Sequence, residues 1–252
     1  MAKLGKVFLT AEWMDLLMLN YEVAPKILAA YVPRGTCLDS FEGKTYVTLV
    51  GFWFRKTKLF GSLPMPFHRD FVEINLRFYV RRSSNSEERR GVVFIAEIVP
   101  KRMIALVARV IYGENYFRRP MRSVGRSESG NGTVEYEWRS KNSWCSLTAK
   151  RSDSPAYPSS GSLEQFITEH YWGYSAQRNG GCLEYQVMHP VWRVCPGTET
   201  GFEGDPSPEY GPEIANILSG KPSSSFIADG SAVTVYKGAK ITSREQQNGS
   251  RP

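Results

Sequence analysis

The feature that most constrains the fold is the segment 71–80, in which two kinds of side chain alternate. One row is wholly apolar and consists of Val72, Ile74, Leu76, Phe78 and Val80. The other row consists of Phe71, Glu73, Asn75, Arg77 and Tyr79. A period of two indicates a β-strand, because successive side chains of a strand point to opposite faces. One face of this strand therefore packs in a core, and the ionic groups of the other face need a different environment.

Two interpretations of the polar row compete. A half-buried antiparallel strand normally turns its polar face to solvent, and the alternation alone favours this arrangement. If the strand instead belongs to a barrel, Glu73 and Arg77 line a ligand cavity. The direction in which Glu73 points decides between the two.

The rest of the chain reads as a mainly β (α+β) protein. Strands are predicted at 46–54, 92–99, 133–138, 144–149, 184–194 (interrupted by Pro190), 224–228 and 232–236, and helices at 25–31, 100–113 and 162–170. The stretch 82–90 is predicted to be a turn-rich connection. Many short strands and few helices favour an antiparallel sheet or barrel. No change of composition divides the chain, so we expect one domain over 1–240 and a disordered polar tail over 241–252.

Net charge and cysteine content limit the classes of protein to which the chain can belong. The net charge is +7, but many arginines fall in stretches that resemble solvated loops, so nucleic-acid binding is not favoured. No apolar run is long enough for a membrane-spanning helix, and no signal segment is seen. The four cysteines are scattered, which is typical of reduced thiols in a cytoplasmic protein. A bridge between Cys182 and Cys195 is conceivable if they flank a hairpin.

Motifs for metal or cofactor chemistry were sought and not found. The three histidines, His68, His170 and His189, are far apart, and no metal-ligand spacing occurs. No nucleotide-binding glycine loop and no nucleophile elbow is present. The sequence therefore predicts no metal site and no cofactor.

Several segments together resemble a known family. They include WMDLL at 13–17, DSFEGKTYVTLVGF at 39–52, HRDFVEINLRFYV at 68–80, YGENYF at 112–117, LEQFITEHY at 163–171 and HPVW at 189–192. In this order they resemble the uncharacterised YqjF-like family of bacterial proteins, from about Trp13 to Val235. That family is distantly similar to acetoacetate decarboxylase, whose fold is a closed, cone-like antiparallel β-barrel with a few short helices around a buried pocket. The resemblance implies that Glu73 points inward and that Arg77, on the same face, could receive an anion.

The resemblance also identifies a substitution. The decarboxylase places a lysine that forms an imine with its substrate in a Tyr-Gly-x-Pro-Lys-Lys motif at the end of a helix. In the matching frame this chain has Tyr116 and Phe117 at the two lysine positions and Asn115 in place of the proline. A phenol cannot form an imine, so Schiff-base decarboxylation is not expected. Tyr116 could instead donate a hydrogen bond to a ligand, or simply pack as a buried aromatic residue.

Three hypotheses of function follow. The leading one is a small-molecule protein with a decarboxylase-like pocket that binds an organic acid or carbonyl compound; its candidate residues are Glu73, Asn75, Arg77, Tyr116 and Phe117. The second is a lyase- or hydratase-type enzyme acting on a keto acid through Lys101, which lies beside Arg102. The third is an anion- or nucleic-acid-binding module that uses the arginines. A homo-oligomer is compatible with all three.

Overall fold

The computed structural model describes residues 5–64, 69–84, 87–100, 115–124, 132–141, 143–177 and 180–241. The predicted helix at 100–113, Lys101, His68 and nearly all of the predicted tail lie outside the described residues. No helix in the described ranges is long and apolar enough to cross a membrane. The chain is mostly strand, as predicted.

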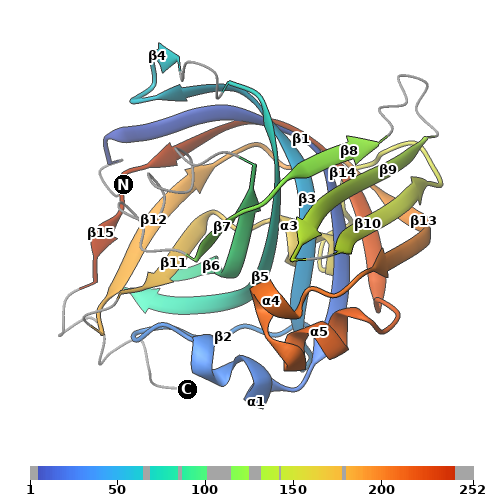
Figure 1. The fold of residues 1–252 in the computed structure, drawn as a ribbon. Helices are drawn as coiled ribbons and strands as arrows, with labels where there is room; N and C mark the ends of the chain where they lie inside the picture. The colour runs from blue at the N-terminus through green and yellow to red at the C-terminus, as the bar shows by residue number, and fades with distance from the viewer. Residues whose placement is uncertain are drawn as a thin grey trace.

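Seven long strands form the part of the sheet that surrounds the site (Figure 1). They are β1 (Val7–Val23), β3 (Thr45–Leu59), β5 (Phe71–Ser84), β6 (Glu87–Val99), β11 (Trp172–Ala176), β12 (Cys182–Met188) and β14 (Ser224–Tyr236). Each pairs with the next in the order β14-β1-β3-β5-β6-β11-β12, and β12 pairs again with β14 through Val187 and Val235. The pairings therefore return to their starting strand. All of them are antiparallel except β6 with β11.

A second group of strands extends the sheet beyond β14. It contains β13 (Val194–Glu203), β10 (Ser143–Arg151), β9 (Thr133–Ser140) and β8 (Met121–Val124), in that order. Three short strands pair at the margins: β2 (Cys37–Leu38), β4 (Leu63–Pro64) and β15 (Ala239–Lys240). The helical elements are α1 (Pro25–Leu28), the 3-10 helix η1 (Ala29–Tyr31), α3 (Leu163–Thr168), α4 (Ser207–Tyr210) and α5 (Pro212–Leu218).

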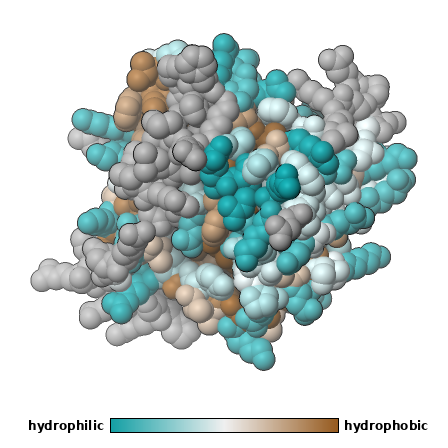
Figure 2. Space-filling view, in the orientation of Figure 1, coloured by the Kyte–Doolittle hydropathy of each residue, from teal (hydrophilic) through white to brown (hydrophobic). Residues whose placement is uncertain are grey.

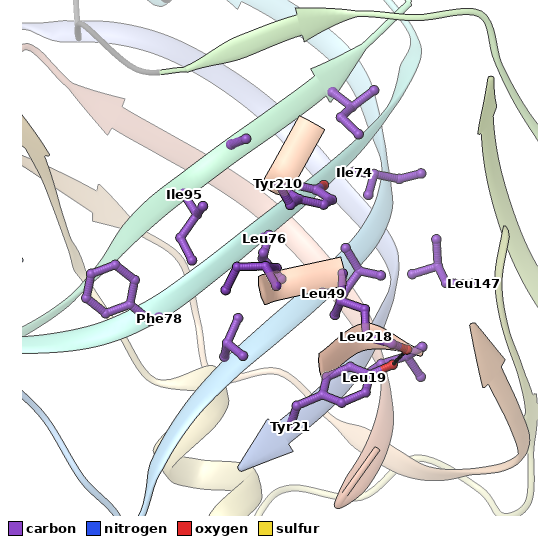
Figure 3. Close-up of a cluster of buried hydrophobic side chains, with 14 of the residues drawn as sticks. Leu19, Tyr21, Leu49, Ile74, Leu76, Phe78, Ile95, Leu147, Tyr210 and Leu218 are labelled. Atoms are coloured by element: carbon purple, nitrogen blue, oxygen red, sulfur yellow. Dashed lines mark hydrogen bonds between the residues drawn. The ribbon is translucent and has the colours of Figure 1, made fainter. Parts of the chain in front are cut away.

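The largest apolar core lies on one face of β1, β3, β5 and β6, between these strands and the group formed by β9, β10, α4 and α5. Figure 3 shows its centre, where Leu49 and Leu76 meet Leu147 and the helix residues Tyr210 and Leu218. Full burial of each such leucine contributes about 1.5–3 kcal/mol to folding. The apolar row of β5 belongs entirely to this core, so the opposite row faces the interior enclosed by the ring of strands.

A β-bulge in β1 keeps apolar side chains on that inner face. The register of β1 against β3 shifts between Met14 and Leu17, and Asp15 has a positive φ of 55°. As a result Trp13 and Leu16, three residues apart, pack in the same inner cluster. An ordinary strand would turn them to opposite faces, because its side chains alternate with a period of two.

The last long strand differs from its prediction. The sequence predicts two short strands separated by a turn at Asp229-Gly230, whereas β14 runs without interruption and pairs with β1 along its length. Gly230, opposite Met14, has φ +83°, and a Cβ atom there would lie 1.9 Å from the carbonyl oxygen of Trp13. The glycine therefore serves the close approach of two strands at the bulge and does not form a turn.

Two other predictions are corrected. The strand predicted at 184–194 is two strands, since β12 ends at Met188 and β13 begins at Val194. Pro190 lies between them and has no N–H to donate to a ladder. The predicted turn-rich stretch 82–90 mostly continues the β5–β6 hairpin, with Arg82 paired to Arg89. All four cysteines are free thiols, so Cys182 and Cys195 form no bridge.

Several arginines that the sequence assigns to solvated loops are paired with carboxylates. Arg82 and Arg89 both contact Glu184 at 2.7 Å, and Arg82 is almost completely buried. Arg90 contacts Asp39 at 2.7 Å. Arginine pairs of this kind hold strands together through charge-assisted hydrogen bonds and leave fewer cations for nucleic acid.

Candidate ligand-binding site

The polar row of β5 lines a cavity inside the ring of strands. Glu73 and Asn75 are each 3% exposed, and Arg77 is 7% exposed. All three lie on the cavity wall, so they do not face bulk solvent. The arrangement expected from alternation alone, with this row in solvent, is therefore wrong, because the ring of strands encloses this face of β5.

The cavity is large enough for a small organic molecule. The volume of the cavity is about 130 Å³. Most of the wall is apolar, and one side is built from aromatic rings. Phe54 stacks on Phe71 with ring centroids 4.6 Å apart, and Trp13 meets Phe52 and Phe54 at 5.5 and 5.7 Å in edge-to-face contacts.

The chain beyond the end of β3 has two exposed apolar side chains. Phe60 and Leu63, which follow β3, are 65% and 58% exposed. Figure 2 shows hydrophobic residues gathered on the surface at the upper left, where Figure 1 places β4. Most of the remaining described surface in this view is hydrophilic or neutral.

Tyr116 also lies on the cavity wall, paired with Glu97. It is the first residue of β7 (Tyr116–Arg118), which runs parallel to β6 with Tyr116 opposite Glu97. The Tyr116 hydroxyl donates a hydrogen bond of 2.6 Å to Oε1 of Glu97. The two groups thus form a buried phenol–carboxylate pair at the cavity, a pair that can share or pass a proton.

A second β-bulge turns Glu97 inward. The register of β6 against β5 shifts so that Arg77 pairs with Phe94 and Leu76 with Ala96, leaving Ile95 as the extra residue. Ile95 and Ala96 both pack in the large core, while Phe94 and Glu97 both line the cavity. Bulges commonly re-aim a side chain beside a functional site. Glu97 is not among the site residues predicted from the sequence, although a carboxylate inside the apolar run VVFIAEIV is a visible signal.

Arg77 is a buried cation held by few partners. Its Nη2 donates to the carbonyl oxygen of Ile167 at 3.2 Å and contacts Sδ of Met18 at 4.0 Å. Its guanidinium carbon lies 5.9 Å from the centre of the Tyr79 ring. No ion pair joins Arg77 to a carboxylate of the described residues, and its Nε has no hydrogen-bond partner there.

Two histidines complete the polar part of the wall. His170 follows α3, is 7% exposed, and packs against Tyr79 with ring centroids 4.7 Å apart. Burial, assisted by the positive charges of Arg90 and Arg77, lowers the pKa of His170 well below its ordinary value. His189 stacks on Trp192 at 4.1 Å, and burial lowers its pKa as well. Both rings are therefore neutral at neutral pH. Nδ1 of His189 donates to the carbonyl oxygen of Pro190 at 2.8 Å, which leaves Nε2 of this ring as an acceptor.

Not all of the site residues predicted from the sequence lie on the cavity wall. Four of the five predicted from the sequence, Glu73, Asn75, Arg77 and Tyr116, lie on the cavity wall. Phe117 does not, since it packs against the large core, with the Arg119 guanidinium 5.5 Å from its ring centre. It occupies the strand position after Tyr116 and so points to the opposite face. The cavity wall also contains His170 and His189, which are not among the pocket residues predicted from the sequence.

No metal centre is formed by the described residues. Nowhere within the described ranges do three or more histidine, cysteine, aspartate or glutamate side chains gather as metal ligands would. The described part of the cavity wall includes no lysine.

The sequence matches the family model of DUF2071, described as an uncharacterized conserved protein, over residues 10–229. The chain belongs to the DUF2071 family. Uncharacterized protein YqjF of Bacillus subtilis (strain 168) is 27% identical to this DUF2071 protein over 180 residues, which is 70% of each chain. The resemblance to the YqjF-like family is thus confirmed.

Solved structures confirm the fold. Acetoacetate decarboxylase from Legionella pneumophila superposes with a TM-score of 0.68 at 13% identity, covering 93% of this chain and 87% of its own. The enduracididine biosynthesis enzyme MppR, solved in complex with pyruvate, superposes with a TM-score of 0.65 at 9% identity, covering 94% of this chain and 91% of its own. An acetoacetate decarboxylase-like enzyme from Sphingomonas wittichii RW1 gives a TM-score of 0.61 at 12% identity, with 92% of each chain covered. At these identities the likeness concerns the fold alone.

Proposed function

We propose that this DUF2071 protein binds a small organic ligand carrying a carbonyl or carboxylate group in the cavity, without forming an imine at position 116. The observation that carries the proposal is a set of buried polar atoms around one apolar cavity. Within the described residues these atoms have no hydrogen-bond partner, and they are Nε1 of Trp13, Oγ1 of Thr57, Oδ1 of Asn75, Nε of Arg77 and both ring nitrogens of His170.

Such atoms are informative because buried polar groups in native proteins are nearly always hydrogen-bonded. An apolar cavity with a few convergent polar groups is the usual form of a small-molecule site. The pyruvate complex of MppR supports the same ligand class, since that enzyme shares the fold and binds a small keto acid.

The chemistry available at the cavity differs from imine formation. Tyr116 presents a hydroxyl already bonded to Glu97, and this pair can donate to, or accept a proton from, a ligand oxygen. The lyase-type alternative depends on Lys101, which lies outside the described residues. Reduction with borohydride in the presence of acetoacetate or pyruvate separates the two hypotheses: we expect no covalent mass increment, and an increment that disappears in Lys101→Ala would favour the alternative.

Ligand-observed NMR with a panel of small acids and ketones tests the site itself. Val50 faces the cavity opposite Asn75, so Val50→Phe should fill the space and abolish binding. Val134→Phe makes the same change in the large core, away from the cavity, and should preserve binding in a folded protein. Binding that persists unchanged in a folded Val50→Phe protein, or the absence of binding by every panel member, would contradict the proposal.

A further inference from the structure

The part of the cavity beside α3 is cationic and has unused hydrogen-bond donors. Arg77 reaches α3 by donating to the Ile167 carbonyl, and His170 follows the helix directly. A guanidinium has five N–H donors, and the one on Nε has no hydrogen-bond partner in the described residues. Thr48, the neighbour of Arg77 on β3, directs its own hydroxyl to Asn20 and Tyr79 at 2.8 and 2.7 Å.

The acidic residues of the cavity, Glu73 and Glu97, form no ion pair with Arg77. Glu73 is four residues from Arg77 on the same face of β5, a separation of about 13 Å along an extended strand. Glu97 lies opposite Asn75 and is bonded to Tyr116. A buried cation without a close anion is costly, because water no longer solvates it. A bound anion would remove this cost at the α3 end.

His170 offers a second contact at the same place. More than nine-tenths of its surface is buried, and neither ring nitrogen makes a hydrogen bond of good geometry within the described residues, although the backbone of Ile167 lies near the ring. The ring lies against Tyr79 and Phe166 at 4.7 and 5.7 Å, so packing fixes its plane. Because the imidazole is neutral, it can donate one hydrogen bond to a carboxylate oxygen without adding charge.

The space between this end and the aromatic wall is apolar. Arg77 and Phe71 are six residues apart on the inner face of β5, about 20 Å along the strand. Val50 lies opposite Asn75, and Phe52 lies opposite Glu73. Together with Trp13 these side chains offer a surface for a hydrocarbon chain or a ring.

We infer that Arg77 and His170 form a carboxylate subsite, and that the ligand is an apolar monocarboxylate whose hydrocarbon body extends from there past Val50 toward Phe52. This inference rests on the proposed function and narrows its ligand class. Arg77 supplies the charge and the Nε donor for the carboxylate, and His170 supplies a neutral hydrogen bond.

Calorimetric titration of the purified full chain with hexanoate and with its neutral analogue hexanamide tests the inference. The two probes have the same length and nearly the same shape, so their affinities differ mainly through the charge. We expect hexanoate to bind the wild-type protein at least tenfold more tightly. Equal affinities, or tighter binding of hexanamide, would overturn the carboxylate subsite without any variant.

Variants then assign the effect to the residues. Arg77→Gln should weaken hexanoate at least tenfold and leave hexanamide within threefold of the wild-type value. Arg90→Gln is the matched control, since it removes an arginine charge near His170 that does not line the cavity, and it should change neither affinity more than threefold. His170→Phe should weaken hexanoate more than His170→Gln does. A folded Arg77→Gln protein with unchanged hexanoate affinity would refute the assignment.

The same titrations separate this inference from the proposed function. If hexanamide and neutral ketones bind but hexanoate gains nothing from its charge, the cavity is a ligand site and the subsite is wrong. If neither probe nor any member of the acid and ketone panel binds, the proposed function itself fails.

Discussion

The two faces of β5 show that a buried face is not by itself a functional site. Both faces are shielded from solvent, and the side chains of both rows, apart from the ends of the strand, are at most 7% exposed. The outer row is made of hydrocarbon packed against other hydrocarbon, as Figure 3 shows around Leu76. The inner row has a carboxylate, an amide and a guanidinium around open space. Buried polar atoms without partners, and not burial itself, distinguish the site from the core.

The largest difference in stability between the two faces should appear when an apolar side chain is shortened. Leu76 is fully buried in the packed core, so Leu76→Ala should reduce the free energy of unfolding by about 2–5 kcal/mol through lost contacts and a new void. Val50→Ala enlarges a cavity that already exists and removes fewer atoms, so it should cost about 1 kcal/mol. Urea unfolding measures both, and equal losses would erase the distinction between the faces.

A smaller contrast is expected between two buried tyrosine hydroxyls. Tyr116→Phe removes the donor from the buried Glu97 carboxylate and should cost about 1–3 kcal/mol. Tyr21→Phe removes a longer, 3.3 Å bond to the neutral carbonyl of Leu218 in the large core and should cost about 1 kcal/mol or less. Thermal unfolding of the two variants provides the comparison, and a larger loss for Tyr21→Phe would reverse the expected order.

Replacing Arg77 should increase the stability of the protein and decrease its affinity for the ligand. Arg77 is buried without a carboxylate partner in the described residues, so Arg77→Met should raise the free energy of unfolding by about 1 kcal/mol while removing the affinity for hexanoate. The unfolding free energy is measured without ligand. A clear loss of stability would show that Arg77 is a structural group of the inner face.

The smallest effect should be a dependence on pH. The pKa of His170 is lowered by burial, so the unfolded state binds a proton before the folded state does as the pH falls. This contribution to stability is complete above the ordinary histidine pKa of about 6.5 and is lost as the pH decreases below it. Between pH 7 and 5.5 the wild-type protein should lose about 1 kcal/mol more than His170→Gln. Parallel pH profiles of the two proteins would mean that His170 is protonated in the folded state.

Much of the fold follows from the sequence, because local periodicity is written directly in the chain. The alternation at 71–80 correctly separates the two rows of β5, whereas the β5–β6 hairpin extends through most of the predicted turn-rich stretch 82–90. The bulges at Asp15 and Ile95 could not be read in this way. Each changes which face a strand presents, and each depends on how the neighbouring strand pairs. For that reason Glu97 was missed and residues 224–236 were divided into two strands.

The sequence by itself determined that β5 has one apolar and one polar face, that position 116 is a tyrosine, and that the chain is mainly strand. Only the tertiary structure decided that the polar face is enclosed. It also brought Glu97 to Tyr116 and placed His170 in the same cavity as Arg77. Strand periodicity specifies which residues share a face, but what covers that face depends on pairings between strands far apart in the chain, such as β12 with β14.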